Sequence, residues 1–258
     1  MEKKNTHIVR RILTRIVPLV LLAYLLLFTG FYVAGIRSTL NTWNSVAEGS
    51  EDTLRYAEEE WDLMHHNALL EARLKMAGSD SIGMTVNLAD SLVQLEMDGV
   101  VLRTIRPEKV EAARFFKGID PVAYVHHFSK PFVITEIEGS IEKNPITTKK
   151  APKDTLEAAQ NEPTLDSVRA EWVEWHLLLD STLIISIVQS DQFDGGPSLK
   201  TWKYRMKRHA KTLGMTNNAM LRLKKPKILP EITVYIPAAE ARSFFRALPR
   251  EGNVIVRL

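Results

Sequence analysis

A run of 21 residues without a charged side chain, from Ile16 to Ile36, constrains this chain more than any other feature. A helix rises about 1.5 Å per residue, so a helix of this length matches the ~30 Å hydrocarbon core of a bilayer. Five Lys or Arg and one acid precede the run, whereas a single cation, Arg37, and then ten uncharged residues follow it. The positive-inside rule therefore predicts a cytoplasmic tail at 1–15, a transmembrane helix at 16–36, and a chain whose bulk lies outside the cytoplasm.

A cleaved signal peptide is the alternative explanation of the same run. Its apolar region would be ~7–15 residues long and would end at a small-x-small cleavage site, which Tyr32–Gly35 matches poorly. The chain also lacks an Asn-x-Ser/Thr sequon, which favours a bacterial envelope over a secretory lumen. We expect an uncleaved anchor in the bacterial inner membrane, with the lipid bilayer as its partner at Ile16–Ile36 and the bulk of the chain in the periplasm.

The charge and composition of residues 37–258, the portion expected outside the cytoplasm, limit the kinds of site that it can contain. Residues 37–258 contain 29 Lys and Arg and 30 Asp and Glu, a net charge of 29 − 30 = −1, so the overall charge of +3 comes from the tail. With 45% hydrophobic and 25% charged residues, the chain has the composition of a packed protein. The absence of cysteine excludes thiol catalysis, cysteine-ligated zinc and thiol redox relays.

Residues 37–77 are predicted to form a helical stalk. The segment has no proline and one glycine, and its apolar and small residues recur at spacings of three and four, as in a coiled coil. This seam could lie on an envelope partner protein, on a second copy of the chain in a homo-oligomer, or on the chain's own globular part. The seam comprises Leu40, Trp43, Ala47, Ser50, Leu54, Ala57, Trp61, Met64 and Ala68.

Residues 80–258 have the pattern of an α+β domain, a mostly antiparallel sheet with short helices. Leu92–Met97 and Val100–Ile105 flank Asp98-Gly99, the pair that type I′ hairpins prefer. A second hairpin is predicted from Trp172–Leu179 and Leu183–Gln189, the latter a central strand. Strands are further expected at Phe132–Ile137, Ile232–Ile236 and Asn253–Val256, helices at Pro107–Lys117, 199–212 (ending at Gly214) and Pro237–Leu248, and a polar connector at 139–166.

The sequence contains no signature of a common catalytic site. The nucleotide-binding, zinc-protease and nucleophile-elbow motifs are absent. The pairs His65-His66, on the predicted stalk, and His126-His127, before a predicted strand, would point in different directions and suit one metal ion badly. We therefore predict no metal site, no cofactor and no catalytic residue; the alternative is a hydrolase or transferase with an unrecognised polar site around His176 and Gln189.

The segment Ser198–Pro230 contains ten cations and no acid. Such a positive field attracts anionic partners, and aromatic side chains among the cations add apolar anchors. Outside the cytoplasm we expect no nucleic acid, so the candidates are peptidoglycan carboxylates, lipid phosphates or the acidic stalk; a solvated lysine-rich helix is the alternative. The predicted binding residues are Lys200, Trp202, Lys203, Arg205, Lys207, Arg208, Lys211, Arg222, Lys224 and Lys225.

Segments 84–106 and 213–258 resemble the beginning and end of L,D-transpeptidase domains, the envelope enzymes that cross-link peptidoglycan stems. The hairpin of Val86–Thr104 is similar to their first hairpin, and Asn217–Leu223, followed by a predicted helix and strand, is similar in place to their Ser-His-Gly-Cys-hydrophobic-Arg motif. Asn218 then stands at the motif histidine, Met220 at the nucleophilic cysteine, and Arg222 is retained. A thioether cannot act as a thiolate nucleophile, so the resemblance implies a pseudoenzyme that keeps a binding surface.

These features together predict a membrane-anchored envelope protein whose exported domain is a non-catalytic binding or scaffold component, in contact with peptidoglycan or an envelope complex. Two alternatives stay open. One is the enzyme with an unrecognised polar site, and the other is a membrane-tethered sensor, which would need a partner for output because the tail of 15 residues is too short for a domain of its own.

Overall fold

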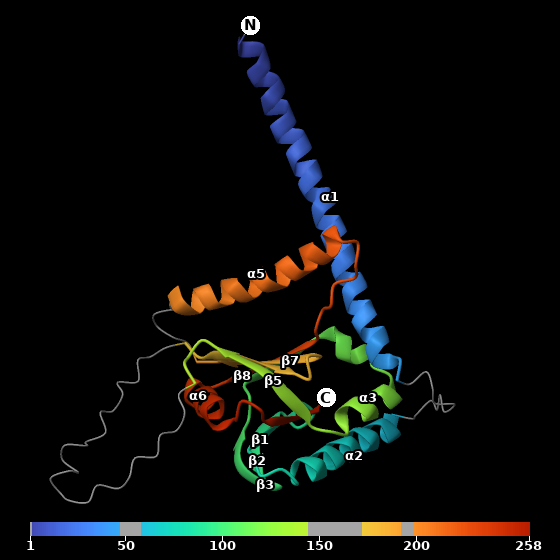
Figure 1. The fold of residues 1–258 in the computed structure, drawn as a ribbon, viewed down its shortest axis with the longest axis vertical. Helices are drawn as coiled ribbons and strands as arrows, with labels where there is room; N and C mark the ends of the chain where they lie inside the picture. The colour runs from blue at the N-terminus through green and yellow to red at the C-terminus, as the bar shows by residue number, and fades with distance from the viewer. Residues whose placement is uncertain (1, 47–57, 144–171, 192–198) are drawn as a thin grey trace, which may run out of the picture. The chain divides into compact units, whose positions relative to one another are not determined.

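The computed structural model describes residues 2–46, 58–143, 172–191 and 199–258 (Figure 1). The chain divides into two compact units. Residues 1–43 with 206–229 form the first, which we call the anchor unit, and residues 44–205 with 230–258 form the second, the sheet unit. The predicted connector at 139–166 lies outside the described residues from 144 onward.

The anchor unit is built on α1 (Glu2–Asn44), which contains the apolar run. Its stretch Arg15–Asn44 is long and apolar enough to cross a membrane. Every side chain from Ile16 to Leu27 is exposed, although most of them are large aliphatic groups. Pro18 lies inside the helix without ending it. The predicted apolar N-terminal helix is therefore confirmed as a helix.

The second helix of the anchor unit is most of α5 (Leu199–Leu221), which begins in the sheet unit. The predicted stop at Gly214 is wrong, because the helix continues for seven more residues. It ends at Leu221, and Leu223, just beyond it, has a left-handed φ of 52°, with the Lys224 N–H donating to Ala219 O at 2.9 Å. This is the hydrogen bonding of a Schellman cap, a place that glycine usually takes.

Residues after α5 pack against the C-terminal part of α1 within the anchor unit. A Cβ added to Gly35 would lie 2.6 Å from Pro226 O, so only glycine permits this approach of the backbone. One turn further along α1, Thr39 Oγ1 donates to Ile228 O at 2.9 Å. Nearer the middle of the apolar run, Tyr24 OH lies 3.5 Å from Asn217 Oδ1 of α5.

The continuous stalk predicted for 37–77 is not confirmed by the described residues. α1 ends at Asn44, residues 47–57 lie outside the description, and α2 (Glu58–Met76) belongs to the sheet unit. Leu69, Ala72 and Met76 are buried in one cluster with Ile255. Burial of these side chains stabilises α2 in the sheet unit. Of the seam residues in α2, Ala68 is buried beside them, whereas Trp61 and Met64 are half-buried.

The sheet unit contains a mixed sheet of nine strands in the order β3-β2-β1-β9-β5-β6-β7-β8-β4. Only the pairs β1–β9 and β7–β8 are parallel, so the predicted α+β class with a mostly antiparallel sheet is confirmed. The strands are β1 (Gly83–Asn87), β2 (Leu92–Met97), β3 (Val100–Ile105), β4 (Lys109–Ala112), β5 (Phe132–Gly139), β6 (Glu174–Leu179), β7 (Leu183–Gln189), β8 (Glu231–Ile236) and β9 (Asn253–Arg257).

Both predicted hairpins are confirmed. β2 pairs with β3 around Asp98 and Gly99, whose φ values of 51° and 76° are those of a type I′ turn. β6 pairs with β7 around Asp180 and Ser181, which are also left-handed. β7 lies between β6 and β8, as the prediction of a central strand requires.

A further local prediction is wrong. The helix predicted for Pro107–Lys117 is instead β4, paired with β8, followed by the 3₁₀ helix η2 (Arg114–Gly118), because pairing across the sheet overrides the local pattern. His126-His127 precedes strand β5 as predicted, and the pair itself lies in α3 (Pro121–Phe128), which Asp120 caps by accepting from Val122 N–H.

The core of the sheet unit lies between β6–β8 and α6 (Ala238–Ala247). Alternate residues of these strands are fully buried on this side, where Trp175 Nε1 donates to Ala241 O at 3.0 Å. α2 and α3 pack against β9. One face of β6–β8 packs in the core. The alternate residues of these strands point to the opposite face, where polar side chains can lie together. The buried strand residues are Trp175, Leu177, Leu179, Leu183, Ile185, Ile187, Ile232, Val234 and Ile236.

Candidate functional site

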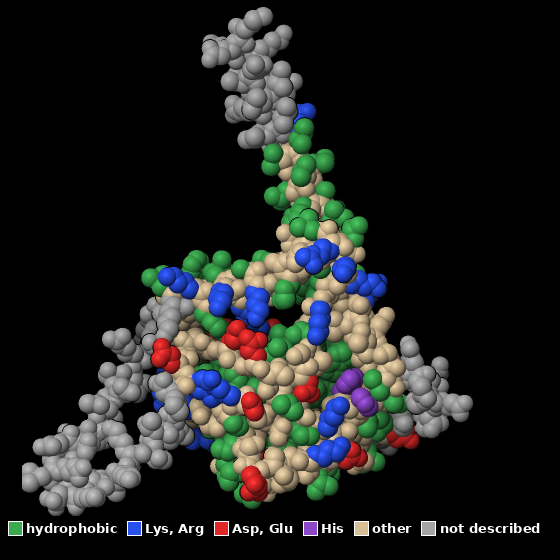
Figure 2. Space-filling model, in the orientation of Figure 1, with side chains coloured by type: hydrophobic (Ala, Val, Ile, Leu, Met, Phe, Trp, Pro, Cys, Tyr) green, Lys and Arg blue, Asp and Glu red, His purple; other side chains and the backbone are tan. Residues whose placement is uncertain are grey.

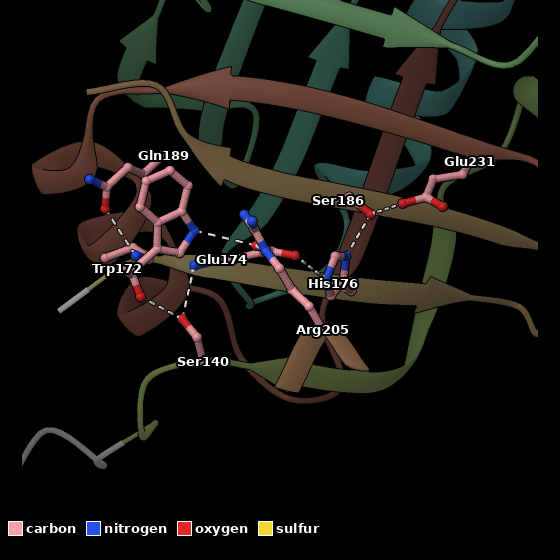
Figure 3. Close-up of polar contacts among 9 residues, drawn as sticks. Ser140, Trp172, Glu174, His176, Ser186, Gln189, Arg205 and Glu231 are labelled. Carbon is pink, nitrogen blue, oxygen red and sulfur yellow. Dashed lines mark hydrogen bonds and ion pairs between the residues drawn. The ribbon is translucent and has the colours of Figure 1, made fainter. Parts of the chain in front are cut away.

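Five polar side chains gather on the face of β6–β8 opposite α6 (Figure 3). They are Glu174, His176, Ser186, Glu231 and Arg205, which we call the polar row. Glu174 and His176 share this face because strand side chains alternate, and Ser186 is the register partner of His176. Arg205 comes from the first turns of α5. All five belong to the sheet unit.

Glu174 is the most strongly held member of the row. Its side chain is 7% exposed and accepts from Arg205 Nε at 2.6 Å, with His176 Nε2 3.4 Å away. Burial by itself raises the pKa of this carboxyl, but hydrogen bonds from His176 and Arg205 and their charges outweigh it and lower the pKa to about 2. Glu174 is therefore a carboxylate and not a proton donor near neutral pH.

The hydrogen bonds of Ser186 decide what the row can do chemically. Its hydroxyl donates to Glu231 Oε1, and its oxygen lies 2.6 Å from His176 Nδ1. A hydroxyl has one proton, so when that proton is shared with Glu231 the second contact needs a proton on His176 Nδ1. A serine nucleophile needs the reverse arrangement, in which histidine accepts the serine proton. The row is consequently a chain of hydrogen-bonded polar groups in which Ser186 is 1% exposed and donates to Glu231 and not to His176.

Neighbouring side chains hold the ends of the row. Ser140 donates to Trp172 O at 2.7 Å and accepts from Glu174 N–H at 3.0 Å. The Arg205 guanidinium lies 5.1 Å from the Trp172 ring centroid, and Tyr204 stacks on His176 with centroids 5.7 Å apart. The row therefore ties the first turns of α5 to β6, and Ser140, directly after β5, holds the backbone of Glu174.

The structure separates the two residues proposed for an unrecognised enzyme site. His176 belongs to the polar row. Gln189 instead accepts from Val173 N–H at 3.0 Å and donates to Asp191 O at 3.2 Å, so its amide serves the backbone. Sequence reasoning did not include Glu174, Ser186 or Glu231, although polar residues at alternate positions of otherwise apolar strands were a signal for them.

The histidine pairs make ring contacts in the structure. His126 and His127 face each other with ring centroids 5.0 Å apart and planes at 87°. His65 stacks on Tyr124 at 3.9 Å, and burial lowers its pKa, with Arg257 lowering it further. Across the described ranges, no three His, Asp or Glu side chains lie together as a metal site would require.

The predicted anion-binding residues separate into three groups. Lys203, Lys207 and Lys211 are exposed on successive turns of α5, with Trp202 and the half-exposed Arg208 beside them. Arg205 points inward to Glu174 and does not belong to an anion site. Arg222, Lys224 and Lys225 are exposed after the helix, and the side chain of Lys200 lies outside the description.

The sequence analysis missed an apolar stripe on α5. Leu199, Trp202, Met206 and Leu213 fall on one side of the helix at about 100° per residue, and their side chains are 79%, 54%, 48% and 55% exposed. The helical spacing was visible in the sequence, but the number of cations in the segment obscured it. Figure 2 shows hydrophobic side chains along one edge of α5 and Lys and Arg on the adjoining side.

Comparison of the chain with protein-family models, with curated proteins and with solved structures found no match. The resemblance to L,D-transpeptidases thus stays a prediction. Asn218 and Met220, at the positions of the motif histidine and cysteine, lie in the last turns of α5, and Arg222 follows the helix.

Proposed function

We propose that this chain is a single-pass protein of the bacterial inner membrane, with its N-terminus in the cytoplasm and its sheet unit in the periplasm. The sheet unit then acts as a non-catalytic binding or scaffold component. The observation that carries the proposal is the exposure of every side chain from Ile16 to Leu27 on a helix long enough to span a bilayer. Such a surface is stable in lipid and costly in water.

The distribution of charge supports the orientation. Lys3, Lys4, Arg10, Arg11 and Arg15 lie on one side of the run, and Arg37 alone lies close on the other. A bacterial translocation machinery retains the more positive flank in the cytoplasm.

The chemistry of the polar row supports a binding role over an enzymatic one. Ser186 donates a hydrogen bond to Glu231, and Glu174 is held as a carboxylate by Arg205 and His176. Both residues are buried, Ser186 at 1% exposed and Glu174 at 5%, which keeps them from a substrate in solution. The proposal includes a pseudo-L,D-transpeptidase that contacts peptidoglycan, supported by Met220 and Asn218 at the positions of the resembled motif.

Topology and binding can be tested separately. Fusions of alkaline phosphatase, which is active only outside the cytoplasm, after Asn44 and after Leu258 should both be active, and a fusion at Arg15 should be inactive. For binding, the intact detergent-solubilised protein should sediment with purified sacculi or copurify with an envelope protein after crosslinking. Inactive fusions at Asn44 and Leu258 would overturn the orientation. The absence of both sedimentation and copurification would overturn the binding role.

A further inference from the structure

We propose that two copies of this chain associate through α2, whose outward face packs in parallel against the same face of a second copy. This face consists of Leu63, Asn67, Leu70, Leu74 and Ala77, and we call it the leucine face. All five residues belong to the sheet unit. The inference goes beyond the proposed binding role because it concerns self-association, and it does not depend on the membrane anchor.

The first support is the exposure of the leucine face. Ala72 and Met76 are buried on the inner side of α2 in the cluster described above. An α-helix has 3.6 residues per turn, so Leu63, Leu70 and Leu74 fall on nearly the opposite side. These three leucines are 61%, 48% and 78% exposed. Packing them against a partner removes their apolar surface from water, which favours association.

The second support is the spacing of the leucine face. Its residues follow one another at intervals of four, three, four and three, which is the heptad pattern of a two-stranded coiled coil. Leu63, Leu70 and Ala77 then take d positions, and Asn67 and Leu74 take a positions. A single Asn at an a position fixes the register of parallel coiled coils, because it pairs with the same Asn of the second helix. Asn67 therefore selects a second copy over an unrelated partner.

The third support is the charge beside the leucine face. His66 lies on one flank, at a g position, and Glu71 lies on the other, at an e position, and both are exposed. In a parallel pair, a g residue lies beside the e residue five positions later in the second helix. His66 of one copy can therefore donate a hydrogen bond to Glu71 of the second copy. An antiparallel pair would instead bring the two flanks that carry Glu71 together, and their like charges would repel.

The β2–β3 hairpin extends this apolar surface beyond the end of α2. A Cβ added to Gly99, in the turn of the hairpin, would lie 3.3 Å from the Cβ of Ala77. Val100 and Val101, which follow the turn in β3, are 62% and 42% exposed. The leucine face and the hairpin thus form one extended apolar surface, and exposed surfaces of this kind mark sites of protein association.

Disulfide crosslinking of the full-length protein in detergent tests the pairing, because the chain has no cysteine of its own. Leu74→Cys places a thiol on the leucine face. Lys75→Cys, one residue further along and turned away from it, is the matched control, and both native side chains are exposed. We expect Leu74→Cys to form a disulfide-linked dimer at least about tenfold faster than Lys75→Cys under the same oxidant.

The same method tests the direction of the pair. Leu63→Cys should also crosslink to itself, but in a mixture of the two variants it should not crosslink to Leu74→Cys, because the two positions are about 16 Å apart along the helix. Asn67→Leu removes the polar group that fixes the register, so it should tighten the dimer about tenfold and allow the mixed crosslink. A mixed crosslink with Asn67 in place would overturn the parallel arrangement.

Sedimentation equilibrium in detergent tests the association without cysteine. We expect a protein mass of twice the 29.3 kDa of one chain. Leu70→Glu should raise the dissociation constant at least about thirtyfold, because it brings two carboxylates together inside the contact. Leu213→Glu, on the similarly exposed Leu213 of α5, is the control and should leave the mass unchanged. Unchanged hydrogen exchange in β6 and β7 would show that the Leu70 variant stays folded.

The remaining outcomes would each overturn the inference. A monomeric wild-type chain would exclude self-association, and a dimer that Leu70→Glu leaves intact would place the contact elsewhere in the chain. A monomer that instead copurifies with another envelope protein, and loses it in the Leu70 variant, would assign the leucine face to that partner. The topology fusions are independent of all these results, so failure of the dimer and failure of the proposed anchor are distinguishable.

Discussion

Arg205 Nε lies 2.6 Å from Glu174 Oε2 and so ties the first turns of α5 to β6 within the sheet unit. The carboxylate is 7% exposed and the guanidinium 35%. The nearly buried carboxylate needs the cation beside it, because removal of the cation leaves a negative charge that water cannot fully solvate.

Arg205→Ala is therefore expected to lower the free energy of unfolding of the sheet unit by about 1–3 kcal/mol, less than for a fully buried pair because the guanidinium is partly solvated. Urea unfolding of the full-length protein in detergent measures the loss. Lys203→Ala, two residues earlier and exposed, is the control and should change stability by less than about 0.5 kcal/mol. An equal effect of both substitutions would show that the pair does not stabilise the unit.

The depressed pKa of Glu174 predicts acid sensitivity. Since its pKa falls from 4.5 to about 2 on folding, the unfolded carboxyl binds a proton more readily. The stabilisation is fully present above about pH 5, is lost as the pH falls towards 2, and is on the order of 3 kcal/mol. Unfolding measured from pH 6 to pH 2 should show this slope, and Glu174→Gln should remove most of it; an unchanged slope in the variant would assign it to other carboxyls.

Two glycines should respond to alanine in opposite ways. Gly99→Ala forces a side chain into a φ of 76° and a Cβ contact of 3.3 Å with Ala77, so the hairpin should lose about 1–2 kcal/mol. Gly214→Ala lies in α5 with open space around its Cβ and should stabilise the helix by about 0.5–1 kcal/mol. Hydrogen exchange should become faster in β2 and β3 in the first variant and slower in α5 in the second; changes of the same sign would contradict the two backbone conformations.

The contact between α1 and the segment after α5 depends on Gly35. Gly35→Leu should prevent the approach of Pro226, whereas Gly30→Leu should be tolerated because nothing lies within 4 Å of its Cβ position. A disulfide between Thr39→Cys and Ile228→Cys reports the contact, since Thr39 Oγ1 and Ile228 O are 2.9 Å apart. We expect crosslinking in the Gly30 variant and its loss in the Gly35 variant; crosslinking in both would show that the approach does not need glycine.

The sequence by itself determined the features that depend on local chemistry. The run Ile16–Ile36 predicted an apolar helix because it contains no charged side chain. Asp98-Gly99 predicted a hairpin because few residue pairs accept two left-handed φ values. The strands β5 to β9 were predicted from their short apolar runs, with boundaries close to those observed.

Only the tertiary structure decided the features that depend on residues far apart in the chain. Pairing with β8 made a strand of Lys109–Ala112, and burial with Ile255 decided that α2 packs on the sheet unit, one of the surfaces that the sequence left open. Arg205 was counted among anion-binding cations until its position beside Glu174 gave it an internal partner. In each case the free energy comes from contacts across more than 30 residues of chain, and local propensity carries no information about such contacts.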